Sequence, residues 1–208
     1  IMLSPMCQYS AQDGLANDWH FAHLGARASG GAGFVFTEAV HTEPRGRITP
    51  FCIGLWTDQQ GSKLARIANF ISSQGAVPGI QLGHAGRKAS VGRPWEGSSP
   101  VPVKAGGWDT IGPSDLSYSS DWNKPDALDQ LGISQQLSSL AAAVRRARDA
   151  GFKALELHAA HGYLIHQFLS PLSNVRQDQY GGDFVNRTRF LLESVDAVRS
   201  EWPVELPL

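Results

Sequence analysis

His158, His161 and Tyr163 place two imidazoles and a phenol within six consecutive positions. Such side chains donate hydrogen bonds to oxygen atoms and transfer protons in enzymes that work near neutral pH. They follow residues 152–157, an apolar segment typical of a buried strand, and small residues and Gly162 break that pattern. Polar groups just after a buried strand are typical of active sites in α/β barrels, at the C-terminal ends of the strands. The spacing therefore predicts a catalytic or binding site here.

Three earlier apolar segments are also followed by polar side chains. These are Cys7 and Tyr9 after residues 1–6, Thr37 and Glu38 after 34–36, and Gln81 and His84 around the end of 77–82. In a barrel of parallel strands, all of these groups would lie together at the C-terminal end of the barrel. This convergence says more about function than any single residue does.

Amphipathic segments separate the predicted strands. In the clearest one, apolar residues recur at helical spacing, which predicts a helix that opens at Thr57-Asp58 and ends at Gly75. Other helices are predicted from Asp18 to about Ser29, from Ser134 to Gly151, and from Asn186 to Trp202. Residues 204–208 are predicted to begin a fifth strand.

Strand and helix thus alternate four times, which implies parallel strands joined by right-handed crossovers. We expect one domain over residues 1–208, an incomplete TIM (β/α)8 barrel, because a closed barrel needs about 250 residues. The chain is accordingly expected to be part of a longer protein. A doubly wound open sheet is the rival fold, but no G-x-G-x-x-G follows the first strand.

Residues 84–133 are predicted to form a long loop after the third strand. From Ala89 to Gly132 the sequence is rich in Gly, Pro and Ser and shows little periodicity. Loops of this length are usually functional lids or disordered. Four aromatic residues suggest that this one packs on something: Trp95, Trp108, Tyr118 and Trp122.

The composition is that of an ordinary globular protein, with 42% hydrophobic residues, 18% charged residues and a net charge of -1. No basic cluster favours nucleic acid, and no apolar run approaches the roughly 18 residues of a membrane span. No signal-peptide pattern is present. Cys7 and Cys52 do not make a disulfide scaffold, so we expect a reducing, cytoplasmic location.

Four motifs together resemble the old yellow enzyme family, whose members are FMN-dependent ene-reductases on a TIM barrel. The Cys after Ser-Pro-Met and the His-x-x-His pair are similar to its thermophilic-like branch. The likeness runs along nearly the whole chain. The motifs are Ser4-Pro5-Met6-Cys7-Gln8-Tyr9, Gln81-Leu82-Gly83-His84-Ala85-Gly86-Arg87, His158-Ala159-Ala160-His161-Gly162-Tyr163-Leu164 and Asn186-Arg187-Thr188-Arg189-Phe190.

The resemblance implies a set of cofactor contacts. Cys7 would lie near the reactive edge of the flavin and tune its potential, and Ala39 would contact the flavin ring. The Gln81 amide, which both donates and accepts, would bind the pyrimidine edge. The remaining flavin neighbours would be Ser4, Pro5 and Met6. The FMN phosphate would be held by residues beyond Leu208.

The resemblance also implies the substrate contacts. Tyr9 would lie against the substrate, His158 and His161 would donate to the oxygen of an activating carbonyl, and Tyr163 would protonate the carbon alpha to it. Hydride arriving at the β-carbon of an enone leaves negative charge on that oxygen. Losing one preorganised donor to such a charge typically costs about 3 kcal/mol. Five further residues are assigned to structure, as ion pairs and hydrogen bonds behind the site: Arg176, Asp178, Tyr180, Arg187 and Arg189.

The implied activity is that of a flavoprotein oxidoreductase, an ene-reductase that reduces activated C=C bonds of α,β-unsaturated carbonyl compounds. NADPH or NADH would reduce FMN and leave before the alkene binds, in a ping-pong mechanism. A longer dienoyl-CoA reductase is a near variant. The expected partners are a small enone-type substrate and, in a full-length protein, further copies of the same chain.

Two alternatives remain open from the residues alone. The first is a metal-dependent TIM-barrel hydrolase that uses His158, His161 and His84, although H-A-A-H lacks the spacing and the glutamate of H-E-x-x-H. The second is an inactive half-barrel fragment that serves only in assembly. Considered singly, the two histidines could equally be hydrogen-bonding residues at a strand end, and Cys7 a small buried hydrophobe.

Overall fold

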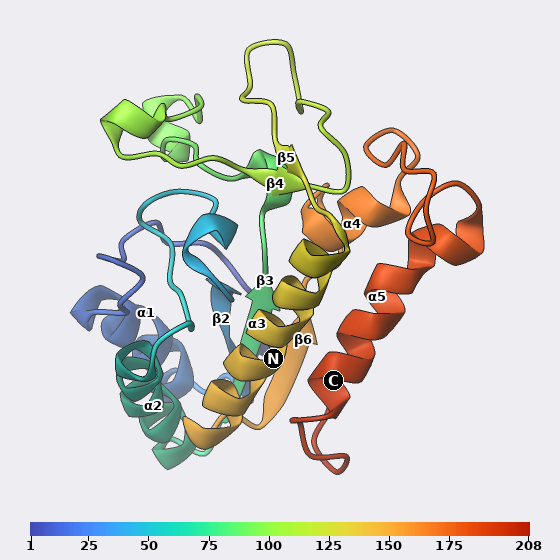
Figure 1. The fold of residues 1–208 in the computed structure, drawn as a ribbon. Helices are drawn as coiled ribbons and strands as arrows, with labels where there is room; N and C mark the ends of the chain where they lie inside the picture. Colours follow the sequence, from blue (N-terminus) through green and yellow to red (C-terminus); the bar gives the residue numbers. More distant parts are fainter.

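The computed structural model describes all residues from 1 to 208 and has a four-stranded parallel sheet at its centre (Figure 1). The strands are β1 (Met2–Leu3), β2 (Phe34–His41), β3 (Val77–Gly83) and β6 (Ala154–Leu157). Their order in the sheet, β1-β2-β3-β6, is also their order in the chain. In a doubly wound sheet the strand order reverses at a switch point, and in this sheet it does not. The arrangement is that of consecutive β/α units in a barrel.

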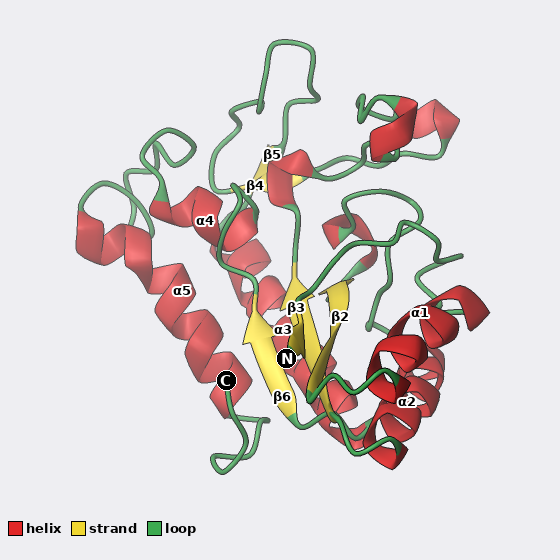
Figure 2. Cartoon of the chain, turned by 180° about the vertical axis from the view of Figure 1, so that it is seen from behind, coloured by secondary structure: helices red, strands yellow, loops and turns green.

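Helices cover one face of this sheet. They are α1 (Asp18–Ser29), α2 (Asp58–Ser73), α3 (Gln130–Asp149) and α5 (Phe184–Arg199), while the short α4 (Leu164–Leu169) lies beyond the C-terminal end of β6. Seen from behind, the strands lie in front of α3, so the opposite face of the sheet is turned toward the viewer (Figure 2). This second face is the one that a closed barrel would turn inward.

The helix starts follow from capping side chains. Thr57 and Gln60 form a capping box that begins α2 where the sequence predicts it. Asn17 caps α1, which begins at the predicted Asp18. The other two starts come earlier than predicted. α5 begins at Phe184 rather than Asn186, and α3 begins at Gln130 rather than Ser134 because Asp129 accepts from the Gly132 amide at 2.7 Å. For the same reason, the segment predicted as a loop from 84 to 133 ends at Asp129.

A cluster of 24 buried residues fills the space between the sheet and the helices. Val35, Ile80 and Leu155 from three strands pack there against Leu64 of α2 and Val144 of α3. Burying each such side chain contributes about 1.5–3 kcal/mol relative to exposing it. The opposite face is more open: Phe34 and Phe36 of β2 and Ala154 and Glu156 of β6 border a hollow of about 490 Å³. The sheet is therefore firmly packed on its outer side only.

The long segment after β3 is ordered and lies over the C-terminal strand ends (Figure 1). It contains three 3-10 turns and a two-stranded parallel pair: η2 (Gly86–Lys88), η3 (Pro94–Glu96), η4 (Val103–Ala105), β4 (Ile111–Gly112) and β5 (Asp126–Ala127). Trp108 Nε1 donates at 2.9 Å to the carbonyl of Arg45 in η1 (Pro44–Gly46), which ties the segment to the turn that follows β2. The segment therefore packs on the sheet, as its aromatic residues suggest.

Residues 204–208 do not form the predicted strand. They make a turn closed by the Leu206 amide and the Pro203 carbonyl at 3.1 Å. Pro203 and Pro207 lack amide donors, so a regular ladder cannot begin there. One ladder-like contact remains, because Leu155 of β6 donates to the Pro207 carbonyl at 3.2 Å. None of the helices combines the length and the apolar composition needed to cross a bilayer.

Candidate functional site

The predicted donors lie together at the end of β6. The His158 amide donates to the Leu82 carbonyl at 2.8 Å, which continues the pairing with β3. The chain then turns sharply, with φ values of 57° at His161 and 73° at Gly162. This turn brings Nδ1 of His161 to 3.2 Å from Nε2 of His158. The Tyr163 ring lies 4.9 Å from the His158 ring, centre to centre.

Hydrogen bonding sets the proton positions in this pair. The Ala160 amide donates to Nδ1 of His158 at 3.3 Å, so the neutral ring carries its proton on Nε2 and donates to His161. Burial, and next the neighbouring His161 ring, lower the pKa of His158. Burial also raises the pKa of Tyr163 to about 12, with smaller contributions from the two cysteine thiols. At pH 7 the site therefore offers neutral imidazole and protonated phenol donors.

A second group of residues lies in one row across the inner face of the sheet. Ala39 of β2 pairs with Gln81 of β3, and Gln81 pairs with Glu156 of β6. The Gln81 amide donates to the Glu156 carboxylate at 2.5 Å. Sequence reasoning named Ala39 and Gln81 but missed Glu156. The available signal was its spacing, since residues two apart in a strand, such as Glu156 and His158, lie on the same face.

The segment after β1 joins the same region. Cys7, Tyr9 and Tyr163 all pack against one small core cluster, which includes Cys52 and Ala85. Burial, and next the negative charge of Glu38, raise the pKa of Cys7 to about 12, so the thiol keeps its proton. Burial raises the pKa of Tyr9 as well. The ends of β1 and β6 are thus brought together as the sequence predicts.

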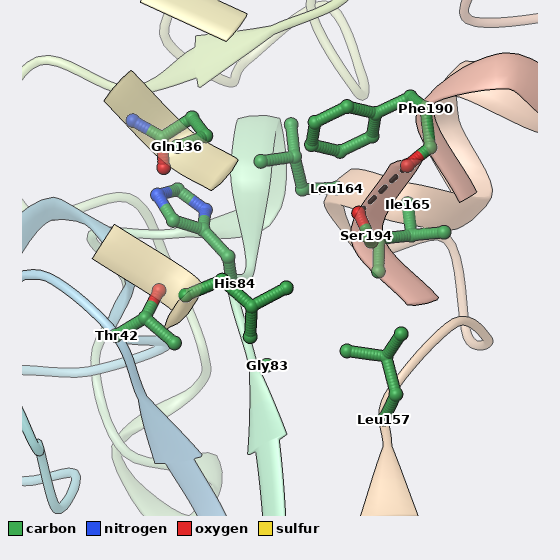
Figure 3. Close-up of a pocket in the computed structure, with 10 residues that line it drawn as sticks. Thr42, Gly83, His84, Gln136, Leu157, Leu164, Ile165, Phe190 and Ser194 are labelled. Atoms are coloured by element: carbon green, nitrogen blue, oxygen red, sulfur yellow. Dashed lines mark hydrogen bonds between the residues drawn. The ribbon is translucent and has the colours of Figure 1, made fainter. Parts of the chain in front are cut away.

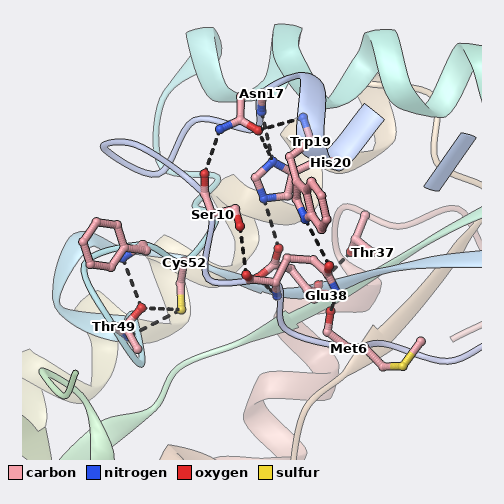
Figure 4. Close-up of polar contacts among 11 residues, drawn as sticks. Met6, Ser10, Asn17, Trp19, His20, Thr37, Glu38, Thr49 and Cys52 are labelled. Carbon is pink, nitrogen blue, oxygen red and sulfur yellow. Dashed lines mark hydrogen bonds and ion pairs between the residues drawn. The ribbon is translucent and has the colours of Figure 1, made fainter. Parts of the chain in front are cut away.

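The buried pair His20–Glu38 contacts the segment after β1 (Figure 4). Nε2 of His20 lies 3.3 Å from the Glu38 carboxylate, and the second carboxylate oxygen accepts from the Gln8 amide at 3.3 Å. The Asn17 amide donates to Nδ1 of His20 at 3.0 Å, which fixes the imidazole. Two of the other predicted flavin neighbours, Ser4 and Met6, line a small cavity beside the same pair, and Pro5 lies between them.

His84 does not join the other two histidines. Its Nε2 lies 2.9 Å from Glu43, which also accepts from the Gln136 amide, and its Nδ1 accepts from the Gly86 amide at 2.9 Å. It borders a cavity of about 30 Å³ next to Leu157 and α5, on the helix side of the sheet (Figure 3). No group of three His, Cys, Asp or Glu side chains is placed to hold a metal ion. The three-histidine arrangement of the hydrolase alternative is therefore not formed.

The segment behind the site is held by the polar residues assigned to structure. Arg176 pairs with Asp178 at 2.5 Å, and the Tyr180 hydroxyl donates to Glu193 at 2.9 Å. Arg187 and Arg189 donate to the carbonyls of Leu169 and Gln179. These contacts match the expected role.

Comparison with known proteins identifies relatives along the full chain. The NADH:flavin oxidoreductase / NADH oxidase family matches residues 1–205. An NADH:flavin oxidoreductase of Gibberella zeae is 47% identical over 212 aligned positions, which cover 100% of this chain and 51% of the relative. An NADPH dehydrogenase of Listeria welshimeri is 43% identical, with 97% of this chain and 56% of the relative covered. The chain spans about half the length of these relatives.

The solved structures give the same result for the fold. Morphinone reductase superimposes with a TM-score of 0.87 at 29% identity, over 100% of this chain and 56% of that one. A 2-naphthoyl-CoA reductase superimposes with a TM-score of 0.86 at 28% identity, over 100% of this chain and 32% of that one. The sheet and its helices are thus an incomplete (β/α)8 barrel, as the alternation of strands and helices predicts. The chain belongs to the NADH:flavin oxidoreductase / NADH oxidase family, the old yellow enzyme family that its motifs resemble.

Proposed function

We propose that this chain forms the flavin- and substrate-binding half of an FMN-dependent ene-reductase that uses NADPH or NADH and works by a ping-pong mechanism. The observation that supports this most strongly is the grouping of His158, His161 and Tyr163 at the end of β6, with Nε2 and Nδ1 of the two histidines 3.2 Å apart. The substrate would be an alkene conjugated to a carbonyl group. Each of the three side chains then has a defined chemical task.

The residues that face the barrel interior fit a flavin. Gln81 carries an amide that donates and accepts, which suits the alternating polar atoms of the pyrimidine edge. Ala39, beside it in the sheet, presents only a methyl group and leaves room for a flat ring. The protonated Cys7 thiol would add a weak donor from the end of β1. When bound, FMN would supply hydride transfer, first from the nicotinamide and then to the substrate.

The imidazole pair would hold the carbonyl oxygen. In the present arrangement the Nε2–H group of His158 donates to His161. A carbonyl oxygen that enters the site would replace Nδ1 of His161 as the acceptor of this bond, and His161 could then donate its own proton to the same oxygen. Burial keeps His158 neutral, and both donors are fixed before the reaction, so they would stabilise the negative charge that develops on the oxygen.

Tyr163 would donate the proton to the carbon alpha to the carbonyl. Its phenol is protonated at neutral pH because burial raises its pKa to about 12. The ring lies 4.9 Å from the ring of His158, so the proton donor and the carbonyl-binding donors would act on adjacent atoms of one substrate. Tyr9, which packs on the same small core cluster, would border the substrate from the β1 side.

The test follows the visible absorption of the flavin in the FMN-loaded protein without oxygen. NADPH should bleach the oxidised band, and 2-cyclohexenone added afterwards should restore it and yield cyclohexanone. Cyclohexanone itself, which has the carbonyl but no alkene, is the control and should leave the band bleached. A protein whose reduced flavin responds equally to both compounds is not an ene-reductase.

A further inference from the structure

The turn that carries His161 holds its peptide groups in an unusual conformation. His161 and Gly162 both have positive φ, 57° and 73°, and non-glycine residues rarely adopt this region. Such a conformation persists only when the surrounding structure holds it in place. Its contacts therefore decide where the His161 imidazole lies.

Two side chains bind the carbonyl groups of this turn. The Lys88 ammonium donates to the His161 carbonyl at 3.0 Å, and the Gln167 amide donates to the Gly162 carbonyl at 2.7 Å. Lys88 comes from η2, after β3, and Gln167 comes from α4. The turn is thus held on both sides by residues outside the motif that contains it.

Gln167 links the turn to the loop after β3. Its side chain is buried, and its amide nitrogen also donates to the Ala85 carbonyl at 3.0 Å while its oxygen accepts from the Arg87 amide at 3.1 Å. Gly86, with a φ of 60°, lies against the Gln167 amide, and a Cβ atom at this position would collide with it. The bare backbone of Gly86 allows this close approach.

Lys88 links the turn to Tyr163 and to Tyr118 of the long segment after β3. Its ammonium lies 5.3 Å from the centre of the Tyr163 ring and 4.8 Å from the centre of the Tyr118 ring. A cation at these distances is attracted to both aromatic faces. One amine thus contacts the His161 backbone, the Tyr163 side chain and the segment over the strand ends.

We propose that Lys88 and Gln167 are positioning residues, which hold the His161–Gly162 turn and thereby set the contact between the two imidazoles. Their importance for alkene reduction rests on the proposed function, while their effect on the imidazole pair does not. Neither residue needs to touch the substrate. Both act through backbone carbonyls, so neither has to belong to the motif that contains the turn.

The first test measures the ring nitrogens of His158 and His161 by 15N NMR, which distinguishes protonated from unprotonated positions. The variants Lys88→Met and Gln167→Met keep an unbranched side chain and remove the donors, and Gly86→Ala displaces Gln167. All three should change the ring signals from those of the wild type. Asn174→Leu is the matched control, because Asn174 is a buried amide that donates to two carbonyls behind the site, of Phe168 and Tyr180.

The second test measures the affinity of the FMN-loaded protein for 4-nitrophenol and its rate of 2-cyclohexenone reduction. We expect about tenfold weaker binding in Lys88→Met and Gln167→Met, with recovery in Lys88→Arg and no change in Asn174→Leu. Wild-type ring signals in both methionine variants would overturn the positioning role. Altered ring signals with unchanged enone reduction would overturn its catalytic importance. A wild-type protein that reduces no enone would instead contradict the proposed function.

Discussion

Nε2 of His20 lies 3.3 Å from the carboxylate of Glu38, and both side chains are only 1% exposed. The same carboxylate accepts from the Gln8 amide at 3.3 Å, so the pair connects α1 and β2 to the segment that carries Cys7. Burial raises the pKa of Glu38, and His20 opposes this effect. Removing one member of such a pair leaves the other buried and unpartnered.

Glu38→Ala should therefore lower the free energy of unfolding by about 3–5 kcal/mol. Glu38→Gln should have a smaller effect because the amide oxygen can still accept from the Gln8 amide. Chemical denaturation at pH 7 measures both values. Asp115→Ala is the control, since Asp115 forms an exposed ion pair with Lys124 and such pairs contribute little to stability. Equal losses in Glu38→Ala and Asp115→Ala would contradict a structural role for the buried pair.

The acid stability of the fold should depend on His41. This imidazole is 1% exposed and neither ring nitrogen has a hydrogen-bond partner. Burial, and next the nearby His84, Arg47 and His158, lower the pKa of His41 from 6.5 to about 3. The folded state therefore binds fewer protons than the unfolded state between these two values.

The contribution of His41 to stability is thus fully present above about pH 6.5 and is lost as the pH falls toward 3. The slope from this one group approaches about 1.4 kcal/mol per pH unit. In His41→Leu this part of the slope should disappear, which urea unfolding between pH 7 and pH 4.5 can measure. Parallel curves for the variant and the wild type would show that the imidazole does not remain neutral in the folded state.

The sequence predicts most of this fold because its signals are local. The apolar face of α2 and its start at Thr57-Asp58 lie within one stretch of chain, and both were found where they were predicted. The prediction was less accurate where pairing between distant segments determines whether a strand forms and where it ends. β2 runs on to His41, beyond the predicted apolar segment 34–36, because it pairs with β3 up to Gly83. Residues 204–208 look apolar but form a turn.

The site residues likewise divide into those that a local signal predicts and those that only the fold reveals. His158, His161 and Tyr163 could be named because six neighbouring positions carry all three side chains. Lys88 and Gln167 could not, since their role depends on two carbonyls that lie 73 and 5 positions away in the chain. No spacing rule in a single sequence relates an ammonium after one strand to a carbonyl after another. Only the folded sheet brings them together.

The imidazole pair should be needed for ligand binding. His158→Ala combined with His161→Ala removes both N–H donors. Losing one donor to a charged oxygen typically costs about 3 kcal/mol, so the affinity for 4-nitrophenol should fall by roughly 10²-fold or more. Titration followed by the absorption of the bound phenolate measures this. Asn174→Leu offers a comparison, because Asn174 donates to carbonyls behind the site and carries no proposed contact to the ligand. An unchanged affinity in the double variant would remove the carbonyl-binding role.

Tyr163→Phe should separate the two half-reactions. The variant keeps the ring that packs beside His158 and loses only the hydroxyl, so reduction of the flavin by NADPH should proceed at the wild-type rate. Reoxidation by 2-cyclohexenone should slow by about 10²–10⁴-fold, the usual contribution of a general acid. Stopped-flow absorption resolves the two steps. Tyr180→Phe is the matched control, since it loses a hydroxyl that donates to Glu193, behind the site.

The pH dependence provides an independent check of this role. Burial raises the pKa of Tyr163 from 10.0 to about 12, so the phenol remains protonated through pH 10. The rate of enone reduction in the wild type should then lose no contribution from this acid between pH 7 and pH 10, whereas a solvent-exposed phenol would be half ionised at pH 10. If both half-reactions slow equally in Tyr163→Phe, or if the wild-type rate of enone reduction halves by pH 10, another group donates the proton.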